Sequence, residues 1–324
     1  MLFLLACFLI LAPSAPLHPR TSFFNHNYAG FPCASRFRAP LSPSPASPSP
    51  ASPSPGGRSP ADPPLAILLP PLGAGVSSWV FEPLLSSALL PRHSLHAPDL
   101  LGTGSSAPFD PSSSGLFFPL DWARQVESLY ASLNTTSPVA LVSQGGVAPV
   151  ALVLAARGKI PLEKLLLLSP PTLETLTAPV PQSKFALNYG LLTFPLWKPL
   201  VVSLLSFPPL VSFFADRVLL SSPSPPFVGE CVSELRRSPH AAEPVFVFNA
   251  GGLFLRSYAP EMAAATCPVA IVSGEDDSRG RIEGRMGLPE AFERAESVSL
   301  ETVQGFKNVM PYEAPEALAE LIGG

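Results

Sequence analysis

The sequence predicts an α/β fold in which a mostly parallel central sheet is flanked by helices. Residues 65–69 (LAILL) and 165–168 (LLLL) are continuous apolar runs, which is typical of parallel strands buried on both faces. Residues 138–154 (PVALVSQGGVAPVALVL) indicate a strand, a sharp Ser-Gln-Gly-Gly turn and a helix. Strand and helix patterns alternate along the chain, and this order places helices on both faces of one sheet.

The remaining elements are expected in the same alternation. A helix is expected over residues 77–89, after the loop at 70–75 (PPLGAG), and a short strand over 94–97. Asp121 is placed to cap a helix that runs to Leu133, because apolar residues recur there at helical spacing. Further along, we expect a helix that ends at 157, strands at 269–273 and 297–303, and helices at 291–294 and 314–322.

The composition fits one globular domain of about 260 residues once the N-terminal region is set aside. The chain has 324 residues, is 47% hydrophobic and carries a net charge of −4. A mildly acidic chain with few basic clusters is a poor nucleic-acid binder. Of four cysteines, only Cys231 and Cys267 lie outside the N-terminal region, too few for a disulfide framework and without metal-ligand spacing. We therefore expect no metal and no cofactor.

Residues 1–61 have the composition of a disordered targeting region. The apolar run at 2–12 is shorter than the roughly 20 residues of a membrane span and is typical of a signal peptide. Arginines and serines follow, with no acidic residue before Asp62, and the repeats at 42–56 (SPSPA, SPSPA, SPSPG) are typical of an extended linker. A signal peptide joined to a transit-like segment resembles the two-part address of plastids bounded by extra membranes. The alternative is a secreted protein with a Pro/Ser stalk.

The pattern changes between residues 172 and 265. Residues 185–215 are strongly apolar, with Lys198 as their only charge. The stretch is long enough for a membrane span, but four prolines and the central lysine argue against one. We expect no integral membrane span outside the targeting region.

Several motifs resemble the α/β-hydrolase superfamily. The unit at 138–154 resembles the nucleophile elbow G-x-S-x-G, and residues 99–106 (DLLGTGSS) resemble the D-x-x-G-x-G-x-S turn after the fourth strand. The order of parts is similar from residue 65 to 324. The resemblance implies an α/β-hydrolase fold with a core at 62–171 and 266–324 and an inserted helical cap at 172–265 over the site.

The serine of the elbow is displaced from the position that the resemblance implies. If Gly145 is at the apex of the turn, Ser143 and Val147 occupy the flanking small positions and the strand keeps its length. If Ser143 is at the apex, Leu141 crowds the turn. We favour Gly145, because the apex has strained backbone angles that glycine accepts without cost.

The histidine implied by the resemblance is also absent. The family places it after the last strand in a G-H-x-P context, and Val309 occupies that position before a family-like Pro-Tyr-Glu-Ala-Pro at 311–315. Valine cannot transfer a proton. His96 and His240 are candidate substitutes, although each is more typical of a surface or structural histidine.

The catalytic acid and the oxyanion hole that the resemblance implies both have counterparts in this sequence. Asp277 matches the family's acid position, but without a histidine to orient, a solvated acidic loop near Arg279 and Arg281 is the stronger interpretation. Backbone N–H groups of Gly146 and of Gly73 or Ala74 retain the geometry to bind one oxygen. Together, the elbow residues 143–146 and the loop at 73–74 predict a site for a carbonyl group.

Two hypotheses of function follow. The first is a protein without a complete triad, whose capped pocket binds a small apolar or acyl-bearing molecule at Gly73, Ala74, Gly145 and Gly146. The second is an active serine hydrolase that uses Ser143 with an unusual base such as His240, and Asp277. A reaction that uses the oxyanion hole alone is a third class that no residue selects. The sequence identifies neither the ligand nor the oligomeric state.

Overall fold

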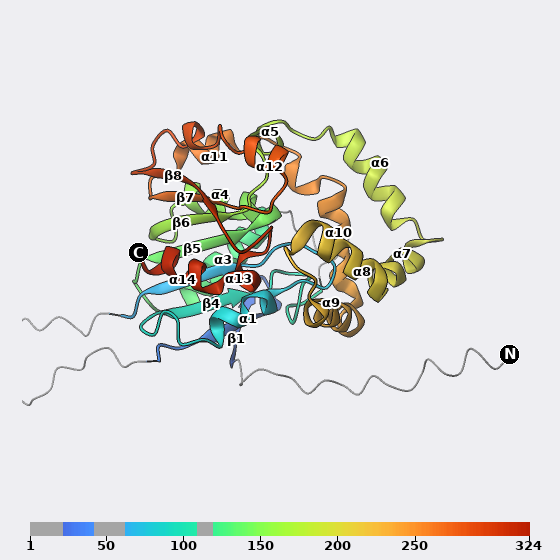
Figure 1. The fold of residues 1–324 in the computed structure, drawn as a ribbon, viewed down its shortest axis with the longest axis horizontal. Helices are drawn as coiled ribbons and strands as arrows, with labels where there is room; N and C mark the ends of the chain where they lie inside the picture. Colours follow the sequence, from blue (N-terminus) through green and yellow to red (C-terminus); the bar gives the residue numbers. More distant parts are fainter. Residues whose placement is uncertain (1–21, 42–61, 109–118) are drawn as a thin grey trace, which may run out of the picture.

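An eight-stranded sheet forms the centre of the fold (Figure 1). The structure is a computed structural model and describes residues 22–41, 62–108 and 119–324. In spatial order the strands are β1 (Ser22–Tyr28), β2 (Phe31–Arg38), β4 (Ser94–Pro98), β3 (Leu65–Leu69), β5 (Val139–Gln144), β6 (Leu162–Leu168), β7 (Val269–Gly274) and β8 (Val298–Val303). Strands β3 to β8 are parallel to one another, while β1 and β2 form an antiparallel hairpin on the β4 edge. The predicted α/β-hydrolase fold class is confirmed.

Helices cover both faces of this sheet because its central strands are apolar on both sides. Along β5, Val139 and Leu141 pack into one apolar cluster, and Ala140 and Val142 into the other. The first cluster includes residues of α3 (Leu120–Ser132), α4 (Ala148–Arg157) and α11 (Ala259–Ala264). The second includes residues of the short helices η1 (Ser78–Phe81), α1 (Glu82–Leu85), α13 (Met310–Glu313) and α14 (Pro315–Gly323).

Three helices differ from their sequence predictions, and one of them, expected over 291–294, is instead a single 3-10 turn, η6 (Pro289–Ala291). The helix expected over 77–89 is only η1 followed by α1, which ends at Leu85. Asp121 does not cap α3, which begins at Leu120 with Pro119 at its N-cap. The Asp121 carboxylate instead accepts a hydrogen bond from the Tyr28 hydroxyl at 2.7 Å. This contact connects α3 to the β1–β2 hairpin.

The β1–β2 hairpin corrects the predicted boundary at residue 61. Ala29 and Gly30 both have positive φ, 52° and 89°, as a two-residue turn between antiparallel strands requires. Arg38 donates from its guanidinium to the carbonyls of Leu84, Ser87 and Leu90. Residues 22–41 are therefore part of the folded domain, and the expectation that all of 1–61 is a disordered targeting region is wrong for this segment. The arginine- and serine-rich, acid-free composition of residues 1–61 resembles a targeting region, and it does not show that Arg38 has hydrogen-bond partners in the fold.

The other N-terminal predictions lie outside the described residues. The expected signal peptide falls in 1–21 and the repeat linker in 42–61. The two-part targeting sequence stays a prediction.

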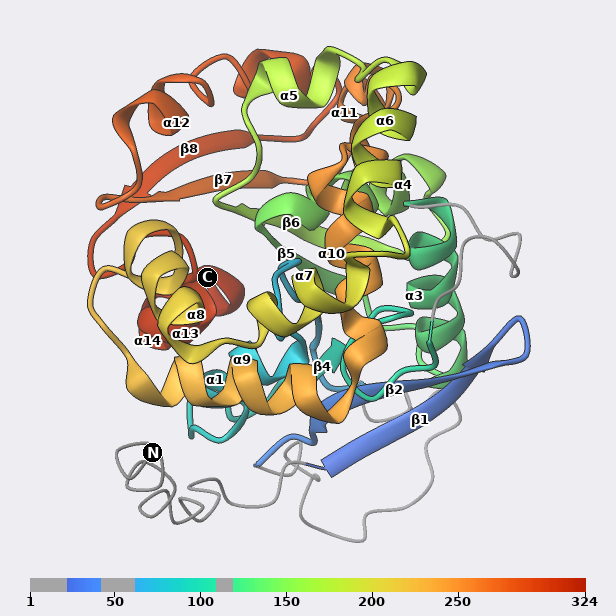
Figure 2. The same cartoon turned by 90° about the vertical axis from the view of Figure 1, so that its right-hand side faces the viewer.

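The inserted segment between β6 and β7 forms helices beside the sheet (Figure 2). They are α5 (Leu173–Thr177), α6 (Gln182–Thr193), α7 (Lys198–Leu205), α8 (Pro208–Phe214), η3 (Ala215–Leu219), α9 (Pro225–Arg237), η4 (Pro239–Ala241), α10 (Ala242–Asn249) and η5 (Gly252–Phe254). The predicted cap boundary at 265 is too late, because Tyr258 and Met262 are buried in the core with α4. After β7 follow α12 (Arg279–Glu283) and η6 (Pro289–Ala291).

Within the described residues, no single helix has the length and apolar composition to cross a membrane. The helices at 198–205 and 208–219 meet that test only as a pair, and the chain bends by 68° between them.

Candidate active site

Gly145 lies at the apex of the elbow. Strand β5 ends at Gln144, and the 3-10 helix η2 (Gly145–Val147) leads directly into α4. Gly145 has φ of +66°, the left-handed conformation that glycine adopts without steric cost. A Cβ at this position would meet only the Pro71 ring, at 3.9 Å, so the space beside the apex is open. The elbow is thus built without a side chain where the family's nucleophile would stand.

Ser143 is a strand residue and not an apex residue. It pairs with Leu69 of β3 and Leu167 of β6, and its side chain is fully buried. By alternation it lies on the same face of β5 as Val139 and Leu141, against the helix layer. Its hydroxyl has no hydrogen-bond partner among the described residues. The structure therefore places the predicted nucleophile inside the sheet.

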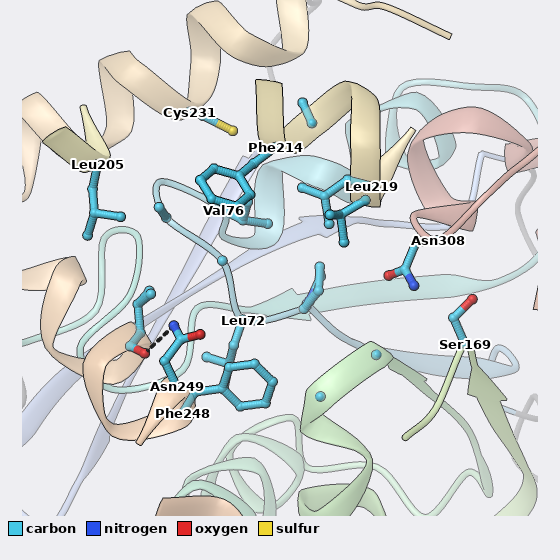
Figure 3. Close-up of a pocket in the computed structure, with 18 of the residues that line it drawn as sticks. Leu72, Val76, Ser169, Leu205, Phe214, Leu219, Cys231, Phe248, Asn249 and Asn308 are labelled. Atoms are coloured by element: carbon cyan, nitrogen blue, oxygen red, sulfur yellow. Dashed lines mark hydrogen bonds between the residues drawn. The ribbon is translucent and has the colours of Figure 1, made fainter. Parts of the chain in front are cut away.

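A cavity of about 660 Å³ lies between the cap and the elbow (Figure 3). Gly145 and Gly146 line it together with Gly73 and Ala74 of the loop after β3. The cap contributes apolar side chains, among them Leu205, Val211, Phe214, Leu219, Val245 and Phe246. The four residues predicted for an oxyanion hole are thus brought together at the wall of one apolar pocket.

The backbone of Gly146 favours an oxygen ligand at this wall, and its lack of a side chain admits a cap residue. The first N–H groups of a helix have no acceptor within the helix, and Gly146 stands at the start of η2. The Phe248 ring packs on Gly146 so closely that a Cβ there would come within 2.4 Å of its Cε2 atom. Glycine at 146 therefore lets an aromatic ring of the cap close over the elbow.

The position after β8 that faces the cavity is Asn308 and not Val309. Val309 is 1% exposed and packs with Phe306 and Met310 in the second apolar cluster. Asn308 lines the cavity. The predicted histidine slot at Val309 is therefore shifted by one residue, because Phe306 and Val309 anchor the loop in the core and leave Asn308 between them at the pocket. The side chain of Asn308 is not a base.

None of the histidines that the structure describes lines the cavity. His96 stacks on Phe37, and burial lowers the pKa of its imidazole to about 4. His240 lies in η4, where burial lowers its pKa and its Nε2 atom has no partner among the described residues. His240 and Ser143 are not brought together in the pocket.

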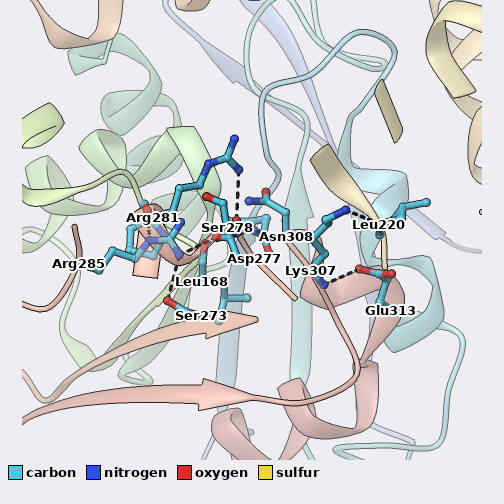
Figure 4. Close-up of polar contacts among 12 residues, drawn as sticks. Leu168, Leu220, Ser273, Asp277, Ser278, Arg281, Arg285, Lys307, Asn308 and Glu313 are labelled. Carbon is cyan, nitrogen blue, oxygen red and sulfur yellow. Dashed lines mark hydrogen bonds and ion pairs between the residues drawn. The ribbon is translucent and has the colours of Figure 1, made fainter. Parts of the chain in front are cut away.

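Asp277 is held by arginines (Figure 4). Its Oδ2 atom accepts from Arg285 Nη1 at 2.8 Å, and its Oδ1 atom from Ser278 N at 2.8 Å and Arg281 Nη1 at 3.4 Å. The carboxylate is buried, so the expected solvated acidic loop is wrong. Arg285 also donates to the Pro170 carbonyl at 2.6 Å, and burial lowers the pKa of its guanidinium. Asp277 thus forms ion pairs with Arg281 and Arg285.

Sequence reasoning missed Ser169. It follows β6, lines the cavity and has φ of +44°, a strained conformation for serine. It is 3% exposed, and its hydroxyl has no hydrogen-bond partner among the described residues. In Figure 3 the side chains of Ser169 and Asn308 point toward one another. The only signal in the sequence was a serine directly after a predicted strand, before Pro170 and Pro171.

A parallel sheet with a glycine-apex elbow, a facing loop after β3 and a helical cap over a pocket defines the α/β-hydrolase class of fold. A sequence profile of the α/β hydrolase family matches residues 66–321, and the chain belongs to that family. No curated protein matches the sequence.

Solved structures with a similar fold have little sequence in common with this chain. They include the epoxide hydrolase CorEH, with a TM-score of 0.64 and 19% identity, over 93% of this chain and 97% of that one. Cfl2 from Burkholderia cenocepacia has a TM-score of 0.63 and 18% identity, over 93% and 94% of the two chains. A serine hydrolase involved in carbazole degradation, CarC, has a TM-score of 0.62 and 14% identity, over 93% and 97%. Such identities show a common fold and leave activity to be argued from the site.

Proposed function

We propose that this protein binds a small apolar molecule with a carbonyl or carboxylate group in its capped pocket and does not hydrolyse it through a serine triad. The observation that carries the proposal is Gly145 at the elbow apex, where no side chain is available to attack. No histidine of the described part of the chain lines the cavity either. Acyl transfer on this scaffold needs both groups.

The distribution of polar groups supports this class of ligand. Most of the lining is aliphatic or aromatic, which favours an apolar chain or ring. The polar groups are few and include Ser169, Asn308 and the backbone of Gly146. Arg281 and Arg285 line the same cavity and favour an electron-rich oxygen. A ligand with one polar end satisfies these groups and leaves its remainder among the apolar side chains.

The alternative is an active serine hydrolase, which the similar fold of known hydrolases motivates. Ser143 supports it poorly, since the residue is buried within β5. Among the described residues that line the cavity, Ser169 is the serine that a substrate would meet.

A paired assay tests the proposal. The purified protein is incubated with a serine-directed fluorophosphonate probe and with p-nitrophenyl butyrate, and separately titrated with the fluorescent fatty acid cis-parinaric acid. We expect no labelling, no turnover and saturable binding of the fatty acid. Val245→Phe should weaken that binding, because Val245 lines the cavity and the larger ring fills part of it.

Two other outcomes would contradict the proposed function. Labelling of Ser143 or Ser169, found by mass spectrometry and accompanied by ester turnover, would support the hydrolase. Absence of fatty-acid binding in the folded protein, or binding that Val245→Phe leaves unchanged, would contradict the pocket proposal.

For location, the proposal is entry into plastids by a two-part targeting sequence. The support is the apolar run at 2–12, followed before the hairpin by a short stretch that contains Ser14 and Arg20 and no acidic residue. Residues 1–21 fused to a fluorescent protein in an algal cell would report plastid delivery. Fluorescence in the medium would favour the secreted alternative.

A further inference from the structure

The cap carries a broad apolar surface on its outside. Helices α6, α7 and α8 lie away from the sheet, at the right-hand end of the molecule in Figure 1. We call their exposed apolar residues the outer cap surface. Its members are Leu187, Leu191, Phe194, Leu196, Trp197, Leu200, Leu204, Phe207, Phe213 and Phe214. Exposed apolar side chains gathered on three successive helices in this way indicate an interaction site in a folded protein.

These three helices lack buried residues. None of the residues of α6, α7 or α8 is buried, although α7 (KPLVVSLL) and α8 (PPLVSFF) are almost wholly apolar. A helix that is apolar all round is normally enclosed by an apolar environment. One side of α7 and of α8 lines the cavity, and a lipid phase covers the apolar residues on their other sides more completely than a flat protein partner would. The pattern therefore favours a membrane over a second copy of the chain.

The charged residues between 178 and 215 also favour a membrane as the partner. Between residues 178 and 215 the charged side chains are Lys184 and Lys198, and no acidic residue occurs. Lys198 pairs with Glu243 of α10 at 2.9 Å, so Lys184 is the charge of this segment that is exposed for an anionic lipid. Trp197 packs against Phe194, and its indole N–H donates to the Leu191 carbonyl at 2.6 Å. Aromatic and basic residues beside an apolar surface are typical of helices that lie in the interfacial region of a bilayer with anionic lipids.

The geometry favours shallow insertion over a span. Helix α7 has 8 residues and α8 has 7, while crossing the hydrocarbon core takes roughly 20. The chain bends by 68° between the helices at 198–205 and 208–219. Short helices joined at such an angle can lie side by side in the plane of a membrane surface.

The outer cap surface is continuous with the cavity. Leu192, Val201, Leu205 and Val211 belong to the same helices and line the pocket. Phe214 lines the pocket and is also 52% exposed. An apolar molecule that leaves a bilayer at this point reaches the cavity without crossing water.

We propose that the outer cap surface docks on a lipid bilayer, with α7 and α8 inserted at the level of the headgroups and the upper acyl chains. The proposal goes beyond ligand binding, and its test uses no ligand, so its failure is distinguishable from failure of the proposed function.

The test is sedimentation of the purified protein with vesicles of phosphatidylcholine, alone or mixed with phosphatidylglycerol. We expect binding to both, and stronger binding to the anionic vesicles. Leu196→Gln with Leu200→Gln should lower the partition coefficient about tenfold or more, because two of the inserted side chains become polar. The matched control is Leu41→Gln with Leu300→Gln, which alters two exposed leucines outside the cap and should change nothing.

Trp197 supplies a second measurement. The chain has three tryptophans, of which Trp79 and Trp122 are buried and Trp197 is 38% exposed. Vesicles should shift the Trp197 emission to the blue, and brominated lipids should quench it. Trp197→Phe should abolish both signals while vesicle binding continues.

The proposal is overturned if the folded protein binds no vesicles of either composition, or if the Leu196/Leu200 variant binds as well as the control. A protein dimer that the same two substitutions dissociate, measured by light scattering without lipid, would assign the surface to a second copy and also overturn it.

Discussion

The Gln144 side chain ties the elbow to the loop after the last strand. Its Nε2 atom donates to the main-chain oxygen of Asn308 at 2.5 Å and to that of Leu168 at 3.2 Å. Gln144 directly precedes the glycine apex, so one amide holds together the ends of β5 and β6 and the loop that carries Asn308. This contact fixes Asn308 as the residue that faces the pocket.

Gln144→Leu should therefore destabilise the protein. The substitution leaves two main-chain oxygens without their donor in a buried site, which costs about 1–3 kcal/mol each when no replacement forms. We expect a loss of about 2 kcal/mol or more in the free energy of unfolding, measured by urea denaturation. Gln304→Leu is the control, because Gln304 is exposed. Equal effects of the two substitutions would show that the tether contributes nothing.

A nucleophile and a base can be restored at the positions that the structure assigns. Gly145→Ser alone should fold, with about 1 kcal/mol of strain from the left-handed backbone, and should hydrolyse esters only at a background rate. Adding Asn308→His should raise p-nitrophenyl butyrate hydrolysis about 100-fold over the single variant, because a positioned base then faces the serine.

The control for this restoration is Gly145→Ser with Val309→His. Val309 is buried in an apolar cluster, so a histidine there should destabilise the fold and leave activity at background. Higher activity with Val309→His than with Asn308→His would return the histidine slot to Val309 and contradict the assignment made from the structure.

Ser169→Gly should stabilise the protein and weaken ligand binding. Glycine removes the strain at φ of +44° and an unpaired buried hydroxyl, which together favour the folded state by about 1 kcal/mol. Loss of a hydrogen-bonding group at the polar end should weaken cis-parinaric acid binding about fivefold. Ser143→Ala is the matched control, since that hydroxyl is also buried and unpaired among the described residues but lies outside the cavity. Equal affinities of the two variants would remove Ser169 from the site.

His96 should make stability depend on pH. Burial lowers the pKa of its imidazole from 6.5 to about 4, so the folded state binds fewer protons than the unfolded state between these values. Stability is then lost as the pH falls from 6.5 towards 4. At about pH 5 the His96 contribution to this loss is about 2 kcal/mol.

The pH effect is measured by comparison with His96→Gln. Other buried groups also make stability depend on pH. Burial raises the pKa of Asp99, which favours the folded state as the pH falls, and burial lowers the pKa of His26, which disfavours it as His96 does. The difference between the original protein and His96→Gln therefore isolates the effect of His96. Denaturation at neutral pH and at about pH 5 should show a smaller loss for the variant. Parallel pH profiles would contradict the expectation.

The central strands and the elbow were predictable because each depends on local sequence. A run of five apolar residues between prolines, such as 65–69, is too short for a buried helix and suits the middle of a parallel sheet, and β3 has those bounds. Gly145 was predictable as the apex because the strained turn selects glycine. These features need no knowledge of distant partners.

The remaining features of the site depend on such partners. The burial of Asp277 follows from Arg285, 8 residues further along, whose guanidinium also reaches Pro170. Asn308 faces the pocket because its neighbours are anchored in the core, which spacing to Pro311 does not reveal. Helix α11 falls inside the predicted cap because no pattern in six residues shows that they pack on α4.

The hairpin at residues 22–38 was missed because arginine and proline content outweighed its strand pattern, and its removal is the last test. A chain that begins at residue 62 exposes the edge of β4 and leaves three carbonyls without Arg38. We expect it to be insoluble or destabilised by about 3 kcal/mol or more, because an open strand edge aggregates and buried carbonyls lose their donor.

A chain that begins at residue 20 retains the hairpin and should match the full protein in thermal denaturation. The same contacts bear on targeting, since a cleavage after Arg38 would remove β1 and β2 from the sheet. N-terminal sequencing of the protein from its native cells should therefore find a first residue before Ser22. A stable, folded native chain that starts beyond residue 38 would show that the hairpin is dispensable, and would return residues 22–41 to the targeting region.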